Sequence, residues 1–151
     1  MYERQIKANE TRNRLETELA IAHIEAKFAW DKGATEPQMK DILKLLRQAQ
    51  WRWDFGVASH GGSFHAPQEI QRILADGLGK TLQARLSIAK VLAKLGYTED
   101  VPLPDISTKE KAQKYIGLDI VSDKEAKEIF LKTMVPEWLR QAKENGRLAD
   151  R

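Results

Sequence analysis

The apolar positions of this chain recur at the three- and four-residue steps that are typical of amphipathic helices. The first 32 residues contain neither Pro nor Gly, and apolar side chains share one helical face at Leu15, Leu19, Ala22, Ala26 and Ala29. This pattern predicts a helix over residues 2–32 that ends at Gly33. The half before Leu15 is almost wholly polar, so we expect it to project from the core or to lean on a partner.

Two further long helices are predicted from capping residues and from the same rhythm. Thr35 and Gln38 have the spacing of a capping box and begin a helix over 36–59, whose apolar face closes at Trp53. Pro67 suits the first turn of a helix over 67–95. That helix carries a narrow seam with an unusually small middle: Ile70, Leu74, Gly77, Thr81, Ala84, Ile88, Val91 and Leu95. Small residues let another helix approach closely, so we expect a close helix pair along this seam.

The last third of the chain reads as a connector followed by two helices. Two prolines make residues 97–106 an extended connector. Capping boxes at Ser107 and Ser122 predict helices over 108–116 and 123–145, the second kinked or restarted at Pro136. The predicted fold class is therefore all-α: about five long antiparallel helices with an extended proline-containing connector, forming a single domain over residues 1–151.

Composition excludes several classes of protein and site. The 25 Lys and Arg and 22 Asp and Glu residues give a net charge of +3 and are interleaved along the chain, which argues against a nucleic-acid partner. The absence of cysteine excludes disulfides, thiolate metal sites and the C-x-x-C-H attachment of a c-type haem within these residues. No apolar run approaches the roughly 20 residues of a membrane span, and the polar start predicts no signal peptide.

The stretch 48–68 holds two of the three histidines and is the one segment that looks prepared for chemistry. His65 precedes Ala-Pro at a loop-to-helix junction, where a neutral imidazole can ligate haem iron or zinc, or can simply cap and pack. His60 lies at a helix end, where it can brace the turn. A zinc site would need a third ligand that no motif supplies, since His23 belongs to another helix. The sequence carries no motif of a self-contained enzyme.

Four separated blocks resemble one known family in the same order: AHIEAKFAWDKGAT, QAQWRWDFGVASHGGSFHAP, PDISTKEKAQKYIGLD and VPEWLRQAKENG. The chain resembles the C-terminal helical region of the ammonia-forming pentahaem cytochrome c nitrite reductases over essentially all 151 residues. The resemblance implies a periplasmic oxidoreductase that reduces nitrite to ammonium with six electrons. It also implies haem c attached to a missing upstream region, and a calcium ion that these residues do not bind. The fragment alone is expected to be inactive.

The resemblance also implies roles for single residues. It makes His65 the distal axial ligand of one bis-histidine haem and gives His60 a structural or supporting role. Arg52 is a candidate partner for a haem propionate, while Trp53 is expected to close the core stripe. The implied partners are a second copy of the chain, the haem-bearing remainder of the enzyme, and an electron-donor cytochrome or quinol-oxidising subunit. The second copy would bind through the long helices, which fits the seam over 70–95.

Two rival hypotheses remain at the level of the sequence. The chain could be a stand-alone helical scaffold or protein-interaction module that binds no cofactor. It could also bind free haem through His65 without the rest of an enzyme.

Overall fold

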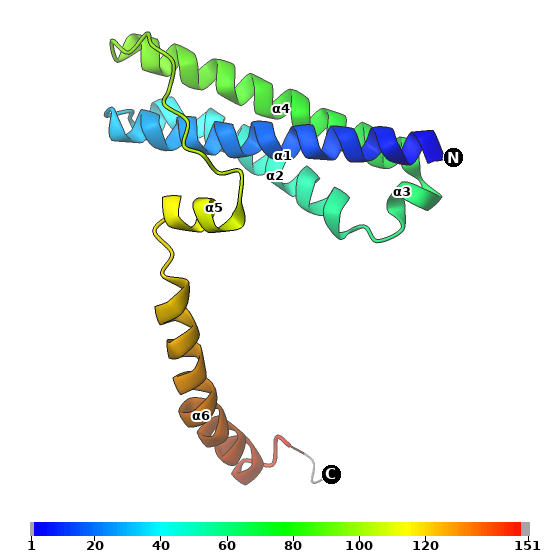
Figure 1. Cartoon of the computed structure of the whole chain (residues 1–151), viewed down its shortest axis with the longest axis vertical. Coiled ribbons are helices and arrows are strands. Elements are labelled where there is room, and N and C mark those ends of the chain that lie inside the picture. Colours follow the sequence, from blue (N-terminus) through cyan, green and yellow to red (C-terminus); the bar gives the residue numbers. More distant parts are fainter. Residues whose placement is uncertain (1, 149–151) are drawn as a thin grey trace. The chain divides into compact units, whose positions relative to one another are not determined.

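The computed structural model describes residues 2–148 and confirms the all-α prediction (Figure 1). The described residues contain no strand. Their helices are α1 (Tyr2–Asp31), α2 (Glu36–Ala58), α3 (Gly62–His65), α4 (Pro67–Lys94), α5 (Lys109–Tyr115) and α6 (Ile120–Glu144). The short helix α3 was not predicted, because the sequence around the two glycines was read as a free loop.

Contacts between Cα atoms group the chain into two compact units, one ending at Leu103 and the other beginning at Pro104. The first unit holds α1 to α4 and the second holds α5 and α6. A single domain over residues 1–151 stays a prediction.

Three long helices form the first unit, in which α1 and α4 run parallel and α2 runs antiparallel to both (Figure 1). The predicted stripe on α1 is buried throughout and meets the apolar faces of α2 and α4. The largest fully buried side chains of this core are Leu15, Met39, Leu46, Leu74, Ile88 and Thr81. The core therefore lies along the shared axis of α1, α2 and α4.

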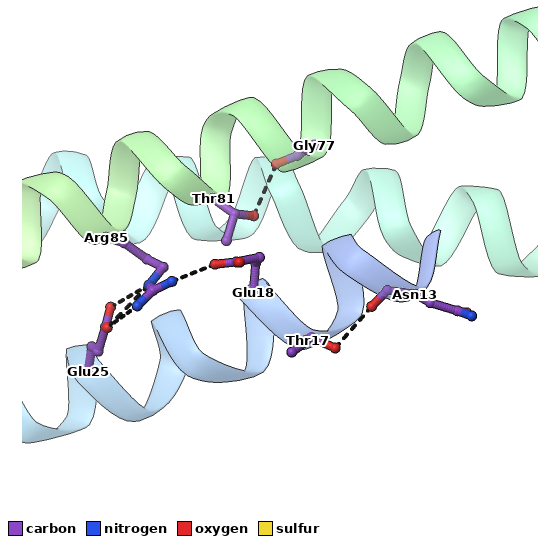
Figure 2. Close-up of polar contacts among 7 residues, drawn as sticks. All are labelled: Asn13, Thr17, Glu18, Glu25, Gly77, Thr81 and Arg85. Atoms are coloured by element: carbon purple, nitrogen blue, oxygen red, sulfur yellow. Dashed lines mark hydrogen bonds and ion pairs between the residues drawn. The ribbon is translucent and has the colours of Figure 1, made fainter. Parts of the chain in front are cut away.

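Polar contacts fix the register between the parallel helices α1 and α4. Gln71 Nε2 donates to Thr11 Oγ1 at 2.7 Å, and Arg85 donates to both carboxylate oxygens of Glu25 at 2.6 to 3.1 Å. Both pairs join residues 60 positions apart in the sequence. Figure 2 shows Arg85 reaching Glu18 as well, so one guanidinium bridges two turns of α1. At these two contacts a residue of α1 lies beside the residue of α4 that is 60 positions later in the sequence.

The seam predicted on the third long helix is buried within the chain, except for Leu95 at its end. A Cβ at Gly77 would stand 2.9 Å from Leu15 Cδ2 and 3.2 Å from Arg52 Cβ, so glycine is needed there for close approach of α1 and α2. The predicted close helix contact is confirmed. The proposal that this seam faces a second copy of the chain is wrong for these residues, because α1 and α2 already cover them.

The polar first half of α1 does not project away from the unit. Ala8 is 1% exposed, and Thr11 accepts a hydrogen bond from α4. This half of α1 also contacts α3. Ala8 is small enough for a neighbouring helix to pass closely over it, so this half of α1 is packed without large apolar side chains. The prediction that it projects from the core, which rested on the lack of such side chains, is wrong.

The helix caps confirm one predicted capping box and correct two. The backbone amide of Thr35 donates to Gln38 Oε1 at 2.8 Å, as predicted for the start of α2. At α5 the cap is Thr108, which accepts from the amide of Lys111 at 3.3 Å, and not Ser107. At α6 the cap is Asp119, which accepts from the amide of Ser122 at 3.1 Å. The last helix therefore begins three residues before the predicted start at 123, because a carboxylate upstream caps it.

In the second unit, α6 has no buried residue over its whole described length. Pro136 lies inside this helix, which continues through it. Seven of its large apolar side chains are 40 to 69% exposed: Val121, Ile129, Phe130, Leu131, Met134, Trp138 and Leu139. Among the described residues no helix is both long enough and apolar enough to cross a membrane.

Candidate functional site

The segment between α2 and α4 is shaped by two glycines with different roles. Gly61 has φ +80, in the left-handed region that favours glycine, and caps the short helix α3. At Gly62 a Cβ would stand 3.0 Å from Ile70 Cδ1 and 3.1 Å from Ser59 Cβ. Gly61 therefore turns the chain and Gly62 lets α3 pack against the start of α4.

These glycines place His65 at the end of α3, with its backbone amide donating to the Gly61 carbonyl at 2.9 Å. The side chain is exposed. Its imidazole makes no hydrogen bond or ion pair within residues 2–148, and its ring contact is with Phe64, edge to face at 5.1 Å between centroids. An exposed imidazole with both nitrogens uncommitted is able to ligate a metal brought from outside.

An open surface cavity of about 460 Å³ lies beside His65, between the start of α1 and the start of α4. Three charged side chains line it together with His65: Arg4, Glu69 and Arg72. Arg4 comes from α1, which contacts α3 as well as α4 and so brings Arg4 to the same cavity as His65. The first turn of α4 adds the positive end of its helix dipole to this cavity.

Glu69 and Arg72 form an exposed bidentate ion pair across one turn of α4. Arg72 Nε donates to Glu69 Oε2 at 2.8 Å, and Arg72 Nη2 donates to Glu69 Oε1 at 2.6 Å. The hydrogen bonds from Arg72 lower the pKa of the Glu69 carboxyl, and the same bonds raise the pKa of the Arg72 guanidinium. With Arg4, the side chains lining the cavity carry two positive charges and one negative charge.

The structure does not bring His60 into this cavity. Its side chain is exposed, and its imidazole makes no hydrogen bond within the described part of the chain. The two histidines of the segment thus differ in surroundings, because only His65 lies in a cavity that is also lined by Arg4 and Arg72. A bracing role for His60 stays a prediction.

Arg52 and Trp53 lie on α2 and are engaged within the first unit. Arg52 Nε bonds to the carboxylate of Asp76 on α4, and Arg52 Nη1 donates to the Gln48 carbonyl at 2.8 Å. Arg52 does not line the cavity beside His65. Trp53 packs against the core while half-buried, as predicted, although its Nε1 is buried without a hydrogen-bond partner. Trp51 is exposed and stacks on Phe55 at 5.7 Å.

Other parts of the first unit offer less to a metal or haem. A cavity of about 550 Å³ lies where the connector passes the end of α4, and Glu25, Arg85 and Asp100 line it without a histidine. Within residues 2–148 no three His, Cys, Asp or Glu side chains gather as a metal site would require. The sequence lacks cysteine, so a c-type haem would have to be attached to other residues than these.

The sequence pointed to His65 but missed Arg4 and Arg72. Arg72 lies seven residues after His65, but the chain leaves helical geometry at Ala66 between α3 and α4, so helical spacing could not have signalled it. Arg4 is 61 residues away in the sequence, and only the parallel packing of α1 on α4 brings it near.

Comparison with known proteins gives a consistent match along nearly the whole chain. The family described as Cytochrome c552 matches residues 1–147. The chain is 76% identical to cytochrome c-552 of Parabacteroides distasonis over 99% of its own length and 30% of that protein. It is 76% identical to cytochrome c-552 of Bacteroides thetaiotaomicron over 100% of its length and 31% of that protein. With cytochrome c-552 of Haemophilus influenzae the identity is 52% over 91% of the chain and 26% of that protein.

These matches correct the identification made from the sequence, which named the C-terminal helical region of the pentahaem nitrite reductases. They support a broader assignment, in which residues 1–147 match the Cytochrome c552 family. The names of the relatives specify neither a number of haems nor a reductase activity. The chain spans about 30% of the length of the first two relatives.

Proposed function

The chain belongs to the cytochrome c552 family, and on that premise we propose that it is a haem-supporting part of a nitrite reductase-type oxidoreductase. In this proposal His65 is an axial ligand to one haem iron. The observation that carries the proposal is the exposed, uncommitted imidazole of His65 beside a cavity lined by Arg4 and Arg72. A bound haem supplies reversible electron transfer at its iron.

The residues around His65 suit it to hold a metal. Gly61 leaves the imidazole edge that bears Nε2 free of a neighbouring side chain, because a Cβ there would stand 3.8 Å from Nε2. The rings of His65 and Phe64 stand nearly perpendicular to each other, and the exposed Phe64 adds apolar surface beside the imidazole.

Hemin titration of the chain tests the proposal directly. We expect wild-type protein to shift the Soret band on binding hemin, and His65→Ala to weaken binding at least tenfold. His60→Ala is the matched control, since it removes an exposed imidazole from the same segment but outside the cavity. Equal binding by wild type and His65→Ala would refute the ligand role of His65.

We also propose a homodimer, formed through the outer face of α4 instead of the buried seam. This face repeats exposed small and apolar residues at alternating four- and three-residue steps: Ala75, Gly79, Leu82, Leu86, Ala89 and Ala93. Leu86 is 59% exposed, and a Cβ at Gly79 would meet nothing within 4 Å. Such a repeat is typical of helices that pair along one seam.

Sedimentation of the chain tests the dimer. We expect wild type to sediment as a dimer and Leu86→Glu to sediment as a monomer. Gln83→Glu adds the same charge to a neighbouring face and should leave the dimer intact. A monomeric wild type at high concentration would contradict this interface.

Further features of the proposal come from the resemblance alone. They are a periplasmic location, a calcium ion bound by other residues, the haem-bearing remainder of the enzyme as a partner, and an electron-donor cytochrome or quinol-oxidising subunit. Nitrite as the substrate, and its six-electron reduction to ammonium, are part of the same proposal.

The rival candidate is a helical scaffold that binds no cofactor. The exposed apolar side chains along α6 favour a role in protein contact. A scaffold would show no Soret shift in the hemin titration while still associating with another helix.

A further inference from the structure

We infer that Arg4 and Arg72 bind the propionate groups of the haem that His65 ligates, so that the cavity between the starts of α1 and α4 is a carboxylate subsite. This inference rests on the proposed role of His65 and adds which side chains would recognise the acidic edge of the ligand. It replaces Arg52, the residue suggested by the sequence.

The proposed ligand and both arginines share one cavity. His65, Arg4 and Arg72 line one open cavity, although they come from three elements: the end of α3, the start of α1 and the second turn of α4. The propionates of haem leave one edge of the porphyrin, to the side of the iron. Arg4 and Arg72 line the same cavity as His65, so they are the cationic side chains available to carboxylates of a ligand held there.

The two candidate arginines differ from Arg52 in how far they are engaged. Arg52 is held by the Asp76 carboxylate on α4 and by the Gln48 carbonyl, so it would have to break both contacts to bind another carboxylate. Arg4 is exposed and forms no ion pair within the described residues. Arg72 is paired with Glu69, but both side chains are more than half exposed, and such a pair is weak enough to exchange a carboxylate for another.

The charge of the cavity also favours a carboxylate ligand. The net charge of the lining side chains is +1, from Arg4 and Arg72 against Glu69. The first turn of a 28-residue helix adds further positive potential at the same place. An arginine fork matches a carboxylate with two parallel hydrogen bonds, so the chemistry suits propionates better than it suits a neutral ring.

The test compares hemin with its dimethyl ester, in which both propionates are blocked as neutral esters. Soret titrations are measured for wild type, Arg4→Gln, Arg72→Gln, the double variant and His65→Ala. We expect each single variant to weaken hemin binding about twofold to fivefold and the double variant about tenfold, in keeping with exposed charge-assisted bonds. Binding of the ester should be unaffected by either arginine and lost in His65→Ala.

Two controls sharpen the result. Arg14→Gln removes one exposed arginine from α1 outside the cavity and should leave hemin affinity unchanged. Glu69→Gln removes the competing carboxylate and should tighten hemin binding without affecting the ester. Circular dichroism confirms that each variant keeps its helices.

The two proposals fail in different ways. If hemin and its ester bind equally and the arginine variants match wild type while His65→Ala loses both ligands, the carboxylate subsite is wrong and the His65 ligand role stands. If His65→Ala binds both ligands as well as wild type does, the proposed function itself is wrong.

Discussion

The imidazole of His65 lies directly over Gly61: a Cβ at Gly61 would stand 3.5 Å from His65 Cδ2 and 3.8 Å from His65 Nε2. Gly61 also has φ +80, which a residue with a side chain rarely adopts. The same glycine therefore turns the chain and keeps one edge of the proposed ligand open. Its two roles can be separated by substitution.

Gly61→Ala should lower both stability and hemin affinity. The left-handed backbone makes alanine unfavourable by about 1–2 kcal/mol, and the new methyl group would lie in van der Waals contact with the Nε2 edge of His65, where a ligand would approach. Gly33→Ala is the matched control, since Gly33 has φ +91 but a Cβ there would meet nothing within 4 Å. Urea unfolding should show a similar loss for both variants, and hemin titration a loss for Gly61→Ala alone. Equal hemin affinity in the two variants would argue against the open-edge role of Gly61.

Two glycines on α4 should respond to alanine with opposite signs. Gly79→Ala should stabilise the fold by about 0.5–1 kcal/mol, because alanine has the higher helix propensity and the new methyl group meets no neighbour. Gly77→Ala should destabilise it by about 1–3 kcal/mol, because the new Cβ would stand 2.9 Å from Leu15 Cδ2 and force α1 away. Urea unfolding at low protein concentration measures both effects on the isolated chain. A stabilising Gly77→Ala would mean that the helices are less closely packed than described.

Arg85 should be the charged residue on which the α1–α4 contact depends most. Its guanidinium joins Glu18 and Glu25, and the three side chains are 13 to 30% exposed. Arg85→Lys keeps the charge but cannot form the bidentate contact, and we expect a loss of about 1 kcal/mol in the free energy of unfolding. Arg85→Met leaves two carboxylates unpaired and should cost more, roughly 2–3 kcal/mol.

Removing a carboxylate as well tests whether this loss is electrostatic. Glu25→Gln in the Arg85→Met background should recover part of the stability, whereas simple loss of packing would not be recovered. Asp31→Asn is the control, because its pair with Lys27 is exposed and lies within one helix; it should change stability by less than about 0.5 kcal/mol.

The connector before α5 should show an acid transition at Asp105. Hydrogen bonds from Lys111 and from the side chain and backbone of Ser107 lower the pKa of Asp105 from 3.8 to about 2. Because the folded pKa is lower than the unfolded one, these contacts stabilise the folded segment above pH 3.8 and lose their effect as the pH falls from 3.8 towards 2. Carbon-detected NMR titration of the carboxyl measures the pKa. Lys111→Met should move it back towards 3.8, while Lys114→Met should leave it unchanged.

The ligand role of His65 came from the family resemblance and stays a proposal, whereas the sequence by itself determined the all-α class, the three long helices to within a residue or two and the extended connector. Each of these depends on local chemistry: apolar periodicity sets the buried face, Thr35 and Gln38 set a helix start, and Pro67 sets another. The caps at Thr108 and Asp119 were missed because several nearby hydroxyl and carboxylate groups can cap the same turn. Short-range patterns cannot decide between them.

Only the tertiary structure decided which surfaces are free and which charges meet. The seam over Ile70 to Val91 looked ready for a second chain, yet α1 and α2 bury it, because packing within one chain carries no cost of association. Likewise, Arg52 is held by Asp76 while Arg4 reaches the cavity beside His65. A parallel register of 60 residues between two helices leaves no local signal in the sequence, so the surroundings of His65 could be known only from the fold.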